Sequence, residues 1–104
     1  MSAPRLEDKD PSDIKDYGIN WNKVLTAEGE TVIDTSTWEQ APDQVGLSLL
    51  NSGPHAPYIS GALAVVWVAS GVAGTDYALI NTIVTGGVAP RTHQRSIIIP
   101  CVER

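Results

Sequence analysis

Cysteine and positive charge are both scarce in this sequence of 104 residues. The single cysteine, Cys101, cannot form a disulfide within the chain and cannot by itself supply a zinc site. Seven Lys and Arg stand against twelve Asp and Glu, a balance that lacks the clustered positive charge of nucleic-acid binding. The longest apolar run, residues 62–69, is too short to span a membrane, and residues 1–8 contain no secretory signal pattern. We therefore expect a protein that is made in the cytoplasm and binds neither nucleic acid nor membrane.

Motifs of common catalytic sites are also absent. The sequence contains no Gly-x-Ser-x-Gly elbow, no phosphate loop and no dinucleotide fingerprint. His55 and His93 have no partner at metal-ligand spacing. Cys101 and His93 could act as nucleophile and base, but Cys101 lies in an expected strand, where a buried and inert cysteine is more common. We predict a non-enzymatic protein with no catalytic residues, no cofactor and no metal site.

Short β-strand patterns fill most of the chain. Runs rich in β-branched, aromatic and alternating apolar residues recur about every ten residues, with turn residues between them, and no long segment keeps a helical apolar period. This spacing is typical of an all-β sandwich or barrel. We predict one domain, an immunoglobulin-like antiparallel β-sandwich over residues 17–104, preceded by an extended N-terminal arm over residues 1–16. The expected strands cover residues 19–25, 31–38, 45–50, 58–68, 77–84 and 95–102.

The expected strand around Tyr77 indicates how the sandwich is arranged. Side chains in a strand alternate with a period of two, so one face carries Tyr77, Leu79, Asn81 and Ile83. A Gly-Thr-x-Tyr-x-Leu strand, followed by a glycine-rich hairpin and a β-branched last strand, is typical of the end of an immunoglobulin-like domain. We expect the Tyr77 ring to lie in the core and its hydroxyl group to tie the neighbouring corner of the chain.

Two segments are apolar on both faces of their expected strands. Residues 64–68 and 97–99 are apolar at every position, whereas a sandwich strand with one solvated face alternates apolar and polar residues. Contiguous apolar outer faces favour coverage by other subunits, and we predict a homo-oligomer. The alternative is that single apolar side chains are exposed, as on any protein surface, or that a bulge breaks the register.

The N-terminal arm and the last hairpin carry opposite charges. Residues 10–13 have the Asp-Pro-Ser-Asp sequence of a helix start, and Ile14 and Tyr17 then lie on one side of a single turn. The arm is either a frayed tail or a segment that packs on a surface. Arg91, His93 and Arg95 fall on one side of the last strand if that strand already begins there. This basic row either deters unwanted edge pairing or contacts the acidic arm of a neighbouring copy.

Six short motifs follow one another in a particular order along the chain. They are DPSD at 10–13, DYGINW at 16–21, TW at 37–38, VVWV at 65–68, AGTDYALINTI at 73–83 and RSIII at 95–99. Together they resemble a family of small virion proteins, the fiber–tail adaptor or neck proteins of tailed phages, over about residues 10–102. The resemblance implies an immunoglobulin-like sandwich that is a non-enzymatic structural piece of the particle. A glycine-to-arginine hairpin of the family is matched by residues 86–91, whereas the loop at residues 51–57 is richer in proline.

These observations together predict a structural protein of a tailed phage particle. We expect an adaptor at the portal, neck or tail that links another component, such as fibers, and that belongs to the virion after synthesis in the host cytoplasm. Its partners would be other phage structural proteins and further copies of itself. The arm would become ordered on assembly and strap adjacent subunits together. The interface residues that we predict are Asp10, Pro11, Ile14, Tyr17, Arg91, His93 and Arg95.

A capsid decoration or adhesion module is the alternative function. Such a module would bind carbohydrate or a host surface through its loops, and Tyr58, Trp38 and residues 51–57 would supply the contacts. An exposed pair of aromatic side chains in one concave surface would favour this alternative. An arm docked onto a second copy would favour the adaptor.

Overall fold

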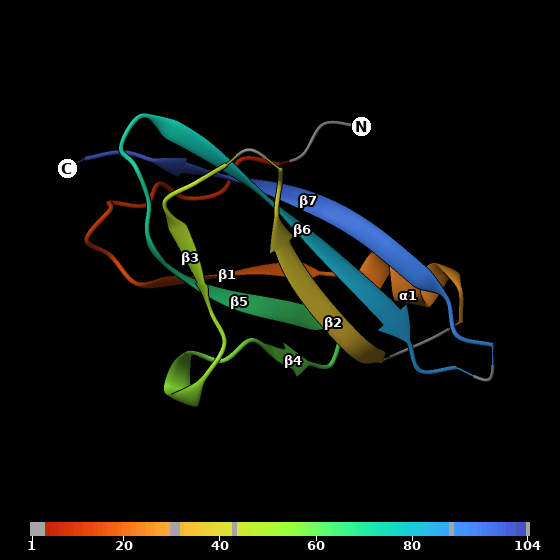
Figure 1. Cartoon of the computed structure of the whole chain (residues 1–104). Helices are drawn as coiled ribbons and strands as arrows, with labels where there is room; N and C mark the ends of the chain where they lie inside the picture. Colours follow the sequence, from red (N-terminus) through yellow and green to blue (C-terminus); the bar gives the residue numbers. More distant parts are fainter. Residues whose placement is uncertain (1–3, 30–31, 43, 88, 104) are drawn as a thin grey trace.

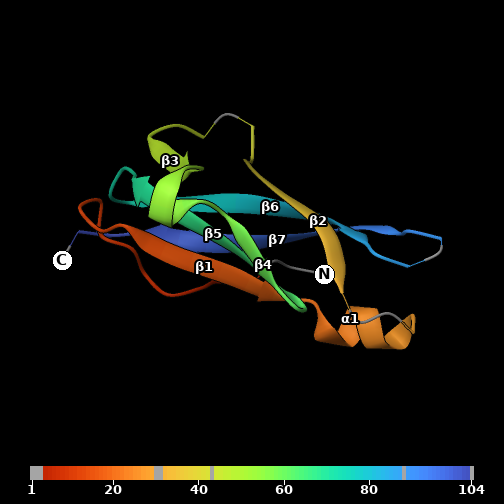
Figure 2. The same cartoon turned by 90° about the horizontal axis from the view of Figure 1, so that it is seen from below.

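The chain folds into two antiparallel β-sheets that pack face to face (Figures 1 and 2), so the predicted all-β class is confirmed. The computed structural model describes residues 4–29, 32–42, 44–87 and 89–103. Within these ranges no helix combines the length and the apolar character needed to cross a membrane.

Each sheet has a long central strand with neighbours on both sides. In the first sheet β5 (Leu63–Ser70) is the central strand. It pairs with β1 (Lys15–Asn20) along one edge, and with β3 (Leu47–Leu50) and β4 (Tyr58–Ser60), one after the other, along its other edge. In the second sheet the order is β2 (Ile33–Gln40), β6 (Thr75–Thr85) and β7 (Thr92–Cys101). Two short helical segments complete the fold, α1 (Asn22–Ala27) after β1 and the 3-10 turn η1 (Gly53–His55) before β4.

Strand alternation places one face of each sheet in a common core. The predicted inward positions of β6 are fully buried, and the residues between them are only half-buried or exposed. The first sheet contributes alternate residues of β5 from the opposite side. The core therefore consists mainly of Tyr17, Ile19, Ala64, Val66, Val68, Tyr77, Leu79, Ile83, Ile97 and Ile99, joined by Trp21, Leu25, Ile33, Leu47 and Cys101.

The predicted strand over residues 19–25 is wrong. β1 begins at Lys15 and ends at Asn20, and the chain then forms α1, which lies at the same end of the sandwich as the β6–β7 hairpin (Figure 1). Trp21 and Leu25 are four residues apart and both fully buried, so helical spacing puts both side chains on one inward face. A helix of six residues is too short to be stable alone, and the burial of these two side chains stabilises it.

The predicted single strand over residues 58–68 is instead a hairpin of two strands. Gly61 has a φ angle of +61°, a conformation that glycine adopts without steric cost, and the chain reverses there. β4 then pairs with β5 in antiparallel register, Tyr58 opposite Val65 and Ser60 opposite Leu63. Alternation alone did not reveal the reversal, because the residues on both sides of Gly61 are strand formers.

The hairpin explains part of the apolar outer face of β5. Val65 alternates with the core residue Val66 and therefore points outward, yet it is only 3% exposed. Tyr58 of β4 lies opposite it on that outer face. The His55 ring packs edge-on against the Trp67 ring, with 4.9 Å between their centroids. Segments of the same chain thus cover side chains that we expected other subunits to cover, and the predicted homo-oligomer stays a prediction.

The N-terminal arm runs along the free edge of β7. Its residues 4–9 lie parallel to β7, with Arg5 opposite Ile98 and Lys9 opposite Cys101. Backbone hydrogen bonds of 2.8–2.9 Å join Pro4 and Leu6 to Ile98, and Lys9 to Pro100 and Val102. The chain then turns at residues 10–13 and enters β1 in the other sheet (Figure 1). The arm therefore closes one lateral side of its own sandwich, and this ordering needs no second copy.

Candidate interaction surfaces

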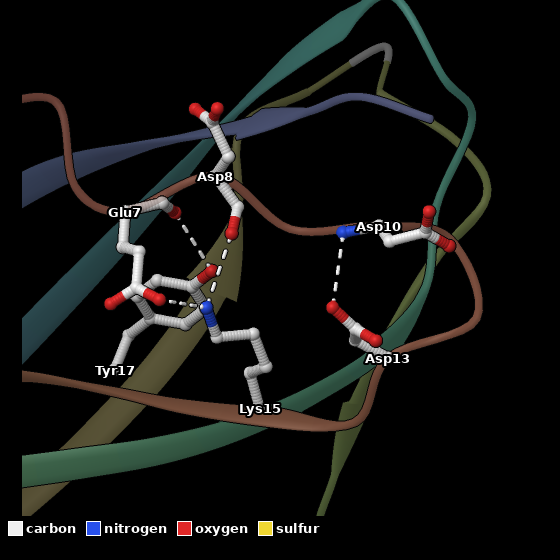
Figure 3. Close-up of polar contacts among 6 residues, drawn as sticks. All are labelled: Glu7, Asp8, Asp10, Asp13, Lys15 and Tyr17. Atoms are coloured by element: carbon white, nitrogen blue, oxygen red, sulfur yellow. Dashed lines mark hydrogen bonds and ion pairs between the residues drawn. The ribbon is translucent and has the colours of Figure 1, made fainter. Parts of the chain in front are cut away.

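Polar side chains tie the arm to β1 (Figure 3). The Tyr17 hydroxyl donates to the backbone oxygen of Glu7 at 2.9 Å. Lys15 Nζ donates to the Glu7 carboxylate at 2.6 Å and to the backbone oxygen of Asp8 at 3.1 Å. Because the arm pairs with β7 whereas Tyr17 and Lys15 belong to β1, these bonds connect the two sheets. The predicted interface residue Tyr17 is buried and holds the arm of its own chain.

Lys9 has the only completely buried charged side chain among the described residues of the arm. Its ammonium group donates to two backbone oxygens, those of Ser70 at 2.5 Å and Asp10 at 2.9 Å. Burial lowers the pKa of the Lys9 ammonium, and burial raises the pKa of the neighbouring Cys101 thiol. Cys101 is buried, as the sequence predicts. We did not identify Lys9 from the sequence, since lysine is rarely buried in full.

The turn between the arm and β1 contains three predicted interface residues. Asp13 N donates to the Asp10 backbone oxygen at 2.9 Å, and Ser12 N donates to an Asp10 carboxylate oxygen at 2.8 Å. This is a single turn held by an aspartate side chain, and no helix follows it. Pro11 is half-buried, whereas Ile14 is 52% exposed. Ile14 is thus the apolar residue of the predicted interface that a partner can reach.

His93 and Arg95 of the predicted basic row lie on one side of β7, and Arg91 stands just before this strand, at the end that α1 covers. Arg91 donates to the Glu28 carboxylate at 2.9 Å, and His93 Nε2 lies 2.5 Å from the other Glu28 oxygen. The Arg95 guanidinium stacks over the Trp21 ring, 5.0 Å from its centroid. Two members of the row therefore pair with an acidic residue of the same chain, just after α1. Whether the row also contacts a neighbouring copy stays a prediction.

A buried polar network fixes this end of the sandwich. Asn81 is fully buried on β6 and accepts a hydrogen bond from Trp21 Nε1 at 2.9 Å. Its amide nitrogen donates to the Ser36 hydroxyl and to the Thr37 backbone oxygen, both at 2.9 Å. Each polar group of the Asn81 side chain is satisfied, so the cost of burying it is offset. The network joins α1, β6 and β2, and it positions Trp21 beneath Arg95.

The opposite end of the sandwich is fixed by Tyr77, as predicted. Its ring is buried, and its hydroxyl donates to the Val45 backbone oxygen at 2.7 Å and accepts from Val72 N at 2.8 Å. Gly46 has a φ angle of +98°, and a Cβ atom there would lie 2.8 Å from Val72 Cγ2. Glycine is thus required for the two loops to approach one another. The side chains of Val45 and Val72 stay exposed at this corner.

The aromatic residues of the alternative function differ in exposure. Tyr58 is 47% exposed, but Trp38 lies partly buried against the core. The loop at residues 51–57 contains η1 and packs His55 on Trp67. No group of three metal-ligating side chains lies together in the part of the chain that the structure describes.

A shallow hollow lies on the lateral side opposite the arm, where β2 contacts β4. It has a volume of about 210 Å³ and is lined by Ser36, Pro57, Tyr58 and Ile59. β2 is the last strand of its sheet, and no strand among the described residues pairs with its outer edge. The arm covers the corresponding edge of β7. The two lateral sides of the sandwich therefore differ.

The sequence of residues 9–100 matches the family described as Podophage GP4 fiber-tail adaptor protein gp77. The chain belongs to this family. The match begins at the buried Lys9 and ends at Pro100 in β7, so it includes both sheets, α1 and the turn that leads from the arm. The resemblance to fiber–tail adaptor proteins is thereby confirmed. A comparison with curated proteins finds no match.

Membership in the fiber-tail adaptor family directs attention to the surfaces of the fold that other proteins can contact. The family description indicates a structural component of the virion that contacts other tail proteins such as fibers. Exposed apolar or aromatic side chains lie at the turn (Ile14), at the corner (Val45 and Val72) and on the side between β2 and β4 (Tyr58).

Proposed function

We propose that this chain is a non-enzymatic adaptor that links fibers to the tail or neck of a podophage particle. The observation that carries the proposal is the family match over residues 9–100, because it spans nearly the whole fold rather than one common strand. Hydrogen bonds of Asn81 and Tyr77 hold the two ends of the sandwich, and the arm closes one of its lateral sides. We expect such a body to be rigid and to present several separate surfaces to partners. Such a body suits a connector, since a rigid connector loses little conformational entropy when it binds.

We infer further that several copies assemble at the portal, neck or tail, after synthesis in the host cytoplasm. Support comes from the exposed Ile14 in the turn and from the exposed valines at the Tyr77 corner. Asp10 and Pro11 precede Ile14 in the chain and Tyr17 follows it, while Arg91, His93 and Arg95 lie at the other end of the molecule. These residues stay our interface hypothesis, with the arm acting between copies only if it leaves its own β7.

The sandwich is, in our proposal, of the immunoglobulin-like kind. Two features support this assignment: the Tyr77 hydroxyl ties a corner near the start of its strand, and the first and last segments run side by side. The order of strands in the first sheet, with β4 beside β5, is a local elaboration of that arrangement.

Phage particles that lack this chain test the proposed function. The gene is inactivated in the phage that encodes it, and particles are purified and their proteins quantified by mass spectrometry. We expect DNA-filled heads that lack both this chain and the fibers, with fibers restored when the chain is supplied from a plasmid. Particles that carry a full set of fibers without this chain would contradict the proposal.

A further inference from the structure

The two lateral sides of the sandwich are closed to different extents. On one side the arm pairs with β7 through four backbone hydrogen bonds and contacts β1 through Lys15 and Tyr17. On the other side β2 and β4 face one another, and the outer edge of β2 has no strand beside it among the described residues. We name this second side, formed by β2, β4 and the hollow between them, the open side.

The open side combines an exposed strand edge with a shallow hollow. Its hollow is lined by Tyr58 and Ile59 of β4, of which Tyr58 is 47% exposed and Ile59 packs against the core. Two buried polar atoms lack a hydrogen-bond partner among the described residues, Trp38 Nε1 and Gln40 Oε1, and both belong to β2. Buried polar groups are normally paired, so these two inward side chains of β2 are exceptions. A register shift lies between Ile33 and Thr35, and the regular part of the β2 edge runs over residues 35–40.

We propose that the open side binds an extended segment of another virion protein, which adds to β2 as a further strand. The arm shows what such a strand gains on the opposite side: backbone hydrogen bonds along one sheet and side-chain contacts across to the other. A strand on β2 would gain the same two kinds of contact, with an apolar side chain in the hollow beside Tyr58. The inference rests on the proposed function, because an adaptor must hold a second protein.

The charges on β2 select the chemistry of this partner strand. Asp34 and Glu39 are both exposed, near the two ends of β2. If β2 paired with β2 of a second copy, the exposed carboxylates of both copies would gather at one edge, and like charges close together are unfavourable. A strand that carries Lys or Arg near its ends, with apolar side chains between them, complements the edge. We therefore assign the open side to a basic strand of a different protein.

The test uses the full chain together with the purified fiber protein and the purified tail protein of the same phage. Hydrogen exchange, read by mass spectrometry, is measured for this chain alone and with each of the two proteins. We expect the backbone amides of β2 to become protected by one of them, because added strand hydrogen bonds slow exchange. Binding that leaves β2 unprotected would overturn the inference and leave the proposed function standing. Binding to neither protein would overturn both.

Charge reversal at the edge tests the partner chemistry. Glu39→Lys should weaken binding about tenfold, since it places a positive charge against a basic strand. Glu103→Lys makes the same change at an exposed position outside β2 and should leave the affinity unchanged. Equal effects of the two substitutions would overturn the assignment of a basic strand. Protection of β2 that rises with the concentration of this chain alone would show instead that a second copy occupies the open side.

Discussion

The Tyr77 hydroxyl joins two loops that are far apart in the sequence. It bonds to Val45 before β3 and to Val72 after β5, so a single oxygen fixes one end of both sheets. The inward position of the Tyr77 ring could be predicted because the residues around it alternate as in a β-strand. Its two partners could not, since neither loop has a distinctive motif.

Tyr77→Phe tests this contact. The substitution leaves the Val45 oxygen and the Val72 amide without their partner, and we expect the free energy of unfolding to fall by about 1–3 kcal/mol. Tyr58→Phe removes a hydroxyl from a half-exposed ring and should change stability by less than about 0.5 kcal/mol. Urea denaturation of the three proteins measures both values. Equal losses for the two substitutions would show that the Tyr77 hydroxyl does not fix the corner.

Lys9 shows the limit of prediction from single residues. A lysine in a charged N-terminal segment is expected to be solvated, yet in the fold it is buried between the arm, Ser70 and Cys101. One of the two carbonyl oxygens that accept its hydrogen bonds belongs to Ser70, 61 residues along the chain, and no local pattern indicates it. Asn81 is a similar case: its strand face was predicted, and its partner Trp21 was not.

At the scale of elements, α1 was the main error of the sequence prediction. Ile19, Trp21 and Lys23 alternate as in a strand, but Trp21 and Leu25 also have the spacing of one helical turn. A short helix and a short strand are not distinguished by so few residues. The end of the sandwich decides between them, because a strand would place Lys23 on the buried face with Trp21 and Leu25, whereas in α1 Lys23 is exposed.

Leu25→Ala tests whether this short helix is anchored through its buried face. Removing a buried leucine side chain should destabilise the protein by about 2–4 kcal/mol. Thr26→Ala changes an exposed neighbour in the same helix and should cost less than about 0.5 kcal/mol. Thermal unfolding followed by circular dichroism gives both values. A small loss for Leu25→Ala would mean that α1 does not contribute to the core.

At the scale of the whole molecule, the arm covers one lateral side of the sandwich, where β7 of one sheet lies near β1 of the other. It pairs with the last strand and bonds to the first, so the two ends of the folded sequence are held together. Such a contact between distant segments cannot be read from either segment alone. The sequence left open whether the arm is frayed or packed, and the fold shows a packed arm.

Deletion of residues 1–9 tests the contribution of the arm. Four backbone hydrogen bonds and the Lys9 contacts are lost, and we expect the free energy of unfolding to fall by at least about 2 kcal/mol. Arg5→Ala removes only an exposed ion pair with Asp76 and should have little effect. Chemical denaturation measures stability, and the mass in solution shows whether the arm also joins copies. Unchanged stability after the deletion would contradict the packing of the arm.

The sequence by itself determined the all-β class, the buried face of β6, the role of the Tyr77 hydroxyl, the burial of Cys101 and the family. These features depend on the spacing of apolar residues and on short motifs. Both can be read from neighbouring residues in the sequence, without knowledge of which segments pack together in space. Only the tertiary structure decided the burial of Lys9, the helix α1, the pairing of the arm with β7 and the open side at β2. Each of these depends on contacts between residues far apart in the chain, where packing and hydrogen-bond satisfaction outweigh local preference.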